Sequence, residues 1–136
     1  MAVRVVFDEL RARLPDAADD PTRFATALRD ATLAANGAIH AYAMRHPEFR
    51  GTGTTSTAAA LLGDTLFLAQ VGDSRGYLVR DGVARQITKD QSLVQKLVEA
   101  GEITPEQAET SARRNIILQA LGPEPTVKVD LTHQQL

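Results

Sequence analysis

Residues 66–79 read Leu-Phe-Leu-Ala-Gln-Val-Gly-Asp-Ser-Arg-Gly-Tyr-Leu-Val, and this stretch decides the fold class. Its first part, Leu66–Val71, is a short and nearly continuous apolar run, which predicts a strand buried on both faces. Tyr77–Arg80 predicts the next strand, and Asp81-Gly82 is a hairpin-turn signal before a further strand at Val83–Ile87. Strands at this spacing, joined by two-residue turns, predict an antiparallel meander.

The segments on either side of this β block predict helices. Over residues 2–46, apolar residues recur at three- and four-residue steps. They are Val3, Val6, Leu10 and Leu14, then Phe24, Leu28, Ala31, Ala35, Ile39 and Tyr42. Asp20 and Pro21 form a helix-start signal between the two sets. Helix signals return over 90–114, and an alternating pattern predicts a last strand at about 126–131. The predicted fold is therefore α+β, with its strands at about 53–88.

The composition limits the function classes. With 136 residues, 43% hydrophobic and 24% charged, the chain has the size and composition of one globular domain. Its net charge of -2, with no strongly basic third, argues against nucleic-acid binding. The absence of cysteine excludes disulfides and thiolate metal sites. No apolar run reaches the length of a membrane span and no signal peptide is recognisable, so we expect a cytoplasmic location.

Two glycine-containing motifs suggest chemistry that their context does not support. Gly72–Gly76 fits the G-x-S-x-G pattern of serine hydrolases, but a strand rather than a helix is predicted after it. This leaves a Ser74 nucleophile as a weak alternative. Residues 51–56 resemble a phosphate-binding glycine loop, but no lysine precedes Lys89 and the loop opens a strand.

Among the carboxylates of the β half, Asp73 is the candidate metal ligand. Asp64 and Asp81 lie beside glycine and are explained by turns, and Asp90 is explained as a residue at a helix start. Asp73 lies at the end of the most apolar strand, where its carboxylate could reach a hard cation such as Mg²⁺ or Mn²⁺. The alternatives are an Asx turn or a pair with Arg75, and composition alone favours these local partners over a metal.

An ordered set of motifs carries a family resemblance. The set comprises Gly53-Thr54-Thr55, the block 68–78 around Val71-Gly72-Asp73-Ser74-Arg75, the block 87–94 containing Asp90-Gln91-Ser92, the block 97–108 and the block 115–122. In this order they resemble the middle of a bacterial metal-dependent serine/threonine protein phosphatase of the PPM (type 2C) family. The resemblance covers essentially residues 1–136 and treats them as one incomplete domain.

The resemblance implies an α-β-β-α sandwich of two antiparallel sheets between helical layers. Residues 90–114 would form a flap beside the active site that tunes substrate access. The family hydrolyses phosphoserine and phosphothreonine with a water activated by a pair of Mn²⁺ or Mg²⁺ ions. The implied partners are phosphorylated Ser/Thr proteins, among them kinases or other signalling proteins.

The resemblance also implies that most of the metal-binding motifs fall outside this chain. No catalytic residue of the family matches within 1–136, and Asp73 is the one matching carboxylate, of the type that holds a third, looser metal. Thr52 and Gln91 stand where the family usually has Met and His. We therefore expect a central fragment that is inactive alone, marginally stable, and prone to self-association through unpaired sheet edges. The alternative is a non-catalytic phosphatase-like binding or regulatory module.

Overall fold

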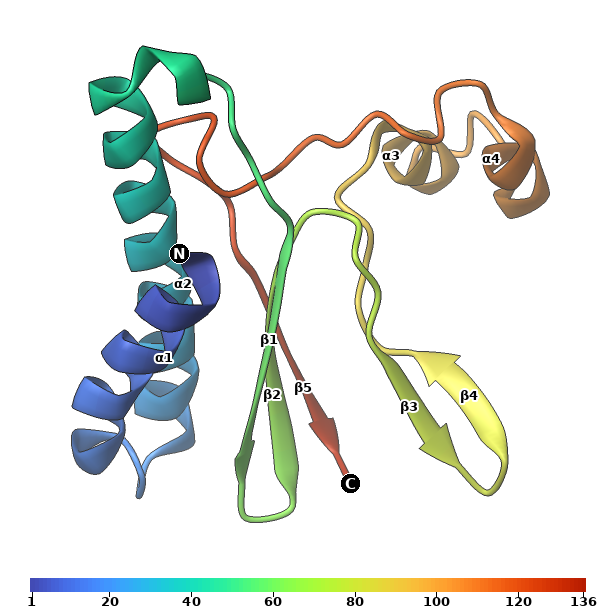
Figure 1. The fold of residues 1–136 in the computed structure, drawn as a ribbon. Helices are drawn as coiled ribbons and strands as arrows, with labels where there is room; N and C mark the ends of the chain where they lie inside the picture. The colour runs from blue at the N-terminus through green and yellow to red at the C-terminus, as the bar shows by residue number, and fades with distance from the viewer.

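A computed structural model describes all residues from 1 to 136 (Figure 1). The helices are α1 (Ala2–Arg13), α2 (Pro21–Arg45), α3 (Leu93–Glu99) and α4 (Pro105–Thr110), with 3-10 turns at Leu14–Asp16 and Pro47–Phe49. The strands are β1 (Ser56–Leu62), β2 (Thr65–Val71), β3 (Tyr77–Arg80), β4 (Val83–Gln86) and β5 (Asp130–Gln135). The predicted α+β class is confirmed.

The helix α2 forms the main contact between the helical layer and the sheet. It begins where predicted, because the Asp20 side chain accepts hydrogen bonds from the backbone N–H of Thr22 and Arg23. Its buried side chains include the predicted apolar residues from Phe24 to Ile39. In α1 only Val6 is buried, and Val3, expected in the same stripe, is 85% exposed. The expectation for Val3 is wrong because the face of α1 that packs against the core carries Ala2, Val5, Val6 and Leu10, and Val3 does not lie on this face.

The main sheet has three antiparallel strands in the order β1-β2-β5. The central strand β2 is buried from Phe67 to Val71, as its apolar run predicts. Strands β3 and β4 form a separate two-stranded antiparallel sheet, so the predicted continuous meander is wrong. Figure 1 shows the chain leaving the end of β2 and running to a separate β3–β4 hairpin. This change of direction begins at Gly72, whose φ is 101°.

The last strand lies later in the chain than expected. The alternation around Val127 and Val129 predicts a strand at about 126–131, whereas β5 spans Asp130–Gln135. Pairing starts at Asp130 because its partner, Gln70, is the last residue but one of β2. Val127 and Val129 pack against the core clusters as irregular chain before the strand begins.

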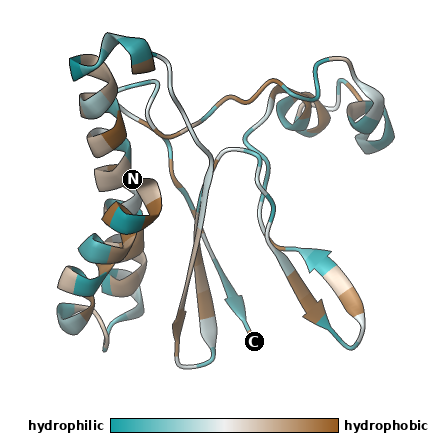
Figure 2. Cartoon of the chain, viewed as in Figure 1, coloured by the Kyte–Doolittle hydropathy of each residue, from teal (hydrophilic) through white to brown (hydrophobic).

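Figure 2 shows hydrophobic residues on the strands of both sheets. Several of the large apolar side chains on these strands are exposed. Val79 and Val83, on the β3–β4 hairpin, are the most exposed of them, and Leu61 of β1 is also exposed. Strands β1 and β5 have no partner on their outer edges. No helix combines the length and apolar character required to cross a bilayer.

Candidate active-site loop

The loop Gly72–Gly76 leaves the buried end of β2 and carries Asp73, Ser74 and Arg75. Gly72 is required at its start for two reasons. Its φ of 101° is a left-handed conformation that side chains disfavour. A Cβ at this position would also collide with the side chain of Thr55, lying 2.9 Å from the Thr55 Cβ. Only glycine therefore satisfies both the backbone conformation and the close approach of Thr55.

Two buried glutamines hold the first half of the loop. Gln70 Nε2 donates to the carbonyl oxygens of Gly72 and Ser74. Gln91 Oε1 accepts from the Gly72 N–H at 2.7 Å, and the Gln91 N–H donates back to the Gly72 carbonyl at 2.9 Å. The Gln91 Nε2 also donates to the carbonyl of Lys128 at 3.1 Å. Gln91 thus joins the loop to the segment that leads into β5.

The second half of the loop is held by Thr88 and by an ion pair. The Gly76 N–H donates to Thr88 Oγ1 at 2.9 Å. Arg75 donates to both carboxylate oxygens of Asp90, with its Nη2 2.7 Å from Oδ2, and the Asp90 side chain is only 10% exposed. The hydrogen bond to Asp90 is the main cause that raises the pKa of Arg75 above its ordinary value. Asp90 is therefore an ion-pair partner of the loop, and a helix-start role does not account for it.

Asp73 carries the only carboxylate of the loop, and this carboxylate has no partner. Arg75 binds Asp90 instead, so the Asp73–Arg75 pair considered from the sequence does not form. The Asp73 carboxylate makes neither the hydrogen bond of an Asx turn nor any other. Asp73 lines a cavity of about 550 Å³ between the loop and the helices α3 and α4. Its oxygens are therefore free to bind a ligand that enters this cavity.

The predicted flap segment, 90–114, forms the other wall of the cavity. Ser92 and Thr104 cap α3 and α4, and Thr104 forms a full capping box with Gln107. The α3–α4 unit is attached where the Leu93 N–H donates to the Ile116 carbonyl and the Leu118 N–H donates to the Gln91 carbonyl. Figure 1 shows the two helices set apart from α1 and α2.

The carboxylates and histidines of the chain do not form a metal site. No group of three His, Asp or Glu side chains converges anywhere in the structure. Of the carboxylates that line the Asp73 cavity, Asp90 is bound to Arg75, and only Asp73 and Glu109 are without a partner. Two carboxylates provide too few protein ligands for a pair of Mn²⁺ or Mg²⁺ ions, each of which takes about six oxygen ligands. The residues present therefore do not fit the two-metal centre that the resemblance implies.

Neither Ser74 nor the histidines His40 and His46 form a catalytic arrangement with another side chain. The Ser74 hydroxyl lies 2.6 Å from the Thr55 hydroxyl and bonds to no histidine, which removes support from a serine-hydrolase triad. His40 Nδ1 contacts the Gly122 carbonyl, and the ring of His46 stacks on Tyr42.

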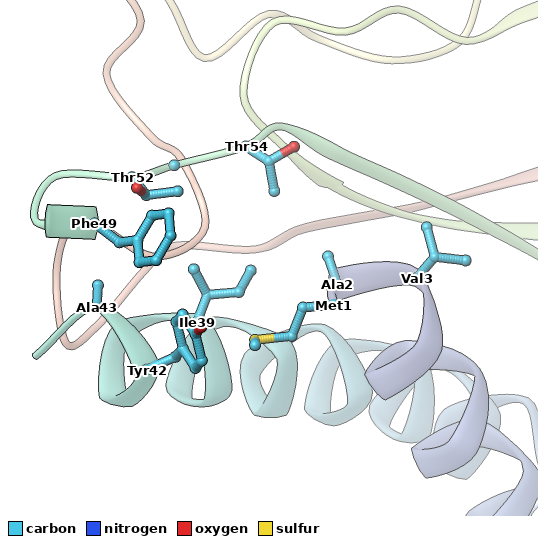
Figure 3. A pocket seen from close by; sticks show the side chains of 10 residues that line it. Met1, Ala2, Val3, Ile39, Tyr42, Ala43, Phe49, Thr52 and Thr54 are labelled. Atoms are coloured by element: carbon cyan, nitrogen blue, oxygen red, sulfur yellow. The ribbon is translucent and has the colours of Figure 1, made fainter. Parts of the chain in front are cut away.

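A separate pocket of about 400 Å³ near the N-terminus is mostly apolar (Figure 3). Its wall includes Ile39, Tyr42 and Phe49 and contains no carboxylate, histidine or cationic side chain. It therefore lacks the groups needed for acid–base or metal chemistry.

Sequence reasoning missed the residues that hold the loop, namely Thr55, Gln70, Thr88 and Gln91. One signal was available, since Gln70 is a polar residue inside a run that is otherwise apolar. A buried amide in a central strand needs hydrogen-bond partners, and the adjacent loop provides them.

Comparison with known proteins gives a consistent family assignment. The sequence profile described as Protein phosphatase 2C matches residues 5–104. The chain is similar to the serine/threonine protein phosphatase PstP of Mycobacterium tuberculosis, with 47% identity over 104 residues, covering 76% of the chain and 20% of PstP. It is also 42% identical over 132 residues to the serine/threonine phosphatase stp of Listeria monocytogenes, covering 92% of the chain and 52% of the relative.

Solved structures show the same likeness. The crystal structure of Stp1 from Staphylococcus aureus matches with a TM-score of 0.84 and 36% identity, over 98% of the chain and 53% of Stp1. The PstP catalytic domain, solved in complex with two manganese ions, matches with a TM-score of 0.71 and 40% identity, over 97% of the chain and 55% of the domain. The chain thus spans about half the length of most of these relatives, and a fifth of full-length PstP.

Proposed function

Because the chain belongs to the protein phosphatase 2C family, we propose that it supplies the central part of a PPM-type phosphatase domain acting on phosphoserine and phosphothreonine. The observation that carries the proposal is the Gly72–Gly76 loop. Its backbone is fixed by hydrogen bonds on both sides of Asp73, while the Asp73 carboxylate is left without a partner and lines a cavity. Such preorganisation of one free ligand group is expected of a functional site.

In this proposal Asp73 gives one carboxylate oxygen to a loosely held Mn²⁺ or Mg²⁺ ion of the third-metal type. In the proposal, the central pair of metal ions takes its ligands from segments outside residues 1–136. The proposal accordingly includes that residues 1–136 alone do not hold the central pair of metal ions and have no phosphatase activity.

The proposed substrates are phosphorylated Ser/Thr proteins, with kinases and other signalling proteins among them. The α3–α4 unit, which forms one wall of the Asp73 cavity, is the proposed substrate-facing flap. A cytoplasmic location belongs to the same proposal.

A second candidate is a non-catalytic, phosphatase-like binding module. The observation that favours it is the exposed apolar surface of the β3–β4 hairpin around Val79 and Val83. Exposed apolar surfaces of this kind mark contacts with another protein or with another segment of polypeptide.

A chimera separates the two candidates. Residues 1–136 replace the matching segment of the Listeria monocytogenes phosphatase, to which 132 residues align. The chimera and the isolated chain are assayed on a phosphothreonine peptide with Mn²⁺. We expect turnover that EDTA abolishes in the chimera and none in the isolated chain. A chimera that melts cooperatively but has no turnover would favour the binding module.

A further inference from the structure

Asp73 is held in place only by its neighbours in the chain. Neither its backbone nor its side chain makes a hydrogen bond, although Gly72, Ser74 and Gly76 all do. The direction of the Asp73 carboxylate therefore depends on how firmly the residues on either side are fixed.

One side chain touches both of these neighbours. The side chain of Thr55 lies against Gly72 so closely that the glycine has no room for a Cβ. The Thr55 hydroxyl oxygen lies 2.6 Å from the Ser74 hydroxyl oxygen, within hydrogen-bonding distance. Thr55 thus contacts the residue before Asp73 with its carbon atoms and the residue after it with its oxygen.

Thr55 is itself attached to the core through the residue before it. The Thr54 N–H donates to the Leu121 carbonyl at 3.0 Å, and the Leu121 N–H donates to the Thr54 carbonyl at 2.8 Å. Leu121 is completely buried, in the cluster that contains Val71 and Ile39. This arrangement gives the Thr55 side chain a rigid base from which to hold the loop.

We propose that Thr55 is a positioning residue that sets the direction of the Asp73 carboxylate. Its hydroxyl contact with Ser74 is exposed to solvent, so its removal changes global stability little. Its effect is local, because the two contacts meet the chain on either side of one residue. The functional importance of this effect rests on the proposed role of Asp73, but the placement of Asp73 can be measured without any activity.

The test uses nuclear magnetic resonance on the 136-residue chain and three variants. Thr55→Val keeps a branched side chain against Gly72 and removes the hydroxyl, whereas Thr55→Ser keeps the hydroxyl and removes the methyl group. Thr54→Val is the matched control, because the Thr54 hydroxyl donates only to the Thr55 carbonyl. The readouts are amide order parameters over residues 72–76, the χ1 couplings of Asp73, and the melting temperature.

In the native chain we expect order parameters near 0.85 over the loop and one dominant χ1 rotamer for Asp73. In Thr55→Val the values at Asp73 and Ser74 should fall below about 0.6, with averaged χ1 couplings and an unchanged melting temperature. In Thr55→Ser the order parameter of Ser74 should return to its native value, while that of Gly72 should fall. Thr54→Val should match the native chain in order parameters, χ1 couplings and melting temperature.

Three results would overturn the proposal. The first is an unchanged Asp73 signal in both Thr55 variants. The second is loosening spread evenly over β1 and β2. The third is loss of folding in both variants, because Thr55 would then determine stability rather than the placement of Asp73. A chimera without phosphatase activity would count against the proposed function and leave these measurements unaffected.

Discussion

Replacing Gln91 by leucine is the sharpest test of how the loop is supported. Gln91 is 8% exposed, and its Oε1 accepts from the N–H of buried Gly72 at 2.7 Å. Leucine has a similar size but no acceptor, so the Gly72 N–H would lose its partner inside the protein. A buried donor left without an acceptor costs about 1–3 kcal/mol.

The second hydrogen bond of the Gln91 amide adds less. The Gln91 Nε2 donates to the carbonyl of Lys128 at 3.1 Å, and Lys128 is an exposed residue whose carbonyl can bind water instead. Losing such a bond costs about 0.5–1 kcal/mol. We therefore expect Gln91→Leu to lower the free energy of unfolding by about 1.5–4 kcal/mol in total.

The assay is urea unfolding followed by circular dichroism, with Gln95→Leu as the control. Gln95 lies on α3, and its Nε2 donates only to Glu99 at the surface, so we expect a change within about 0.5 kcal/mol. Equal m-values would show that both variants change stability rather than the unfolded ensemble. A loss for Gln91→Leu no larger than for Gln95→Leu would refute the reasoning, because water would then replace the amide.

Three further predictions concern the glycines, the sheet edge and pH. Gly37→Ala should stabilise the chain by about 0.5–1 kcal/mol, since Gly37 is a helical glycine with nothing near its Cβ position. Gly72→Ala should destabilise the chain by about 2 kcal/mol or more, because Gly72 has a positive φ and no room for a Cβ. Thermal melts that rank the two variants in the opposite order would contradict this. Strand β1 is an edge strand with no charged residue and no proline, so the native chain should self-associate as its concentration rises. Ala59→Lys should reduce the mass measured by light scattering. Equal masses for the native chain and the variant at all concentrations would contradict this prediction. Hydrogen bonds from the Lys89 ammonium, and then from Gln95, hold the pKa of Glu99 below its ordinary value, so the stability that Glu99 adds is present at neutral pH and is lost as the pH falls through the lowered pKa. Glu99→Gln should remove this small loss of stability at acid pH. Unfolding curves with an unchanged pH dependence in the variant would contradict the assignment.

Much of the fold could be predicted because local signals agree with the tertiary structure. The apolar run at Leu66–Val71 becomes the central buried strand, and Asp20 with Pro21 starts α2 as the pattern predicts. The family resemblance, based on the Gly72–Gly76 motif and its flanking blocks, is confirmed by the profile match and the relatives.

The errors share a physical cause, which is dependence on distant partners. The break between β2 and β3 occurs at the Gly72 turn, which is held by hydrogen bonds to Gln91, 19 positions later in the chain. The start of β5 is set by where β2 ends, and neither is visible in the local alternation.

The support of the candidate site escaped prediction for the same reason. The pair Arg75–Asp90 and the bond from Gly72 to Gln91 span 15 and 19 positions, so no short motif shows them. The sequence favoured a local partner for Asp73, whereas Arg75 turns to Asp90 and leaves the Asp73 carboxylate free. The metal role of Asp73 stays a prediction.

The most direct test of the central claim is the initial rate of phosphothreonine-peptide hydrolysis by the chimera as a function of Mn²⁺ concentration. Asp73→Asn is compared with Asp64→Asn, whose carboxylate lies in the exposed turn between β1 and β2. We expect Asp73→Asn to need about 10–100-fold more Mn²⁺ for half-maximal rate, and Asp64→Asn to match the parent chimera. Identical Mn²⁺ dependence for all three proteins would contradict the claim that the Gly72–Gly76 loop presents a metal-binding carboxylate.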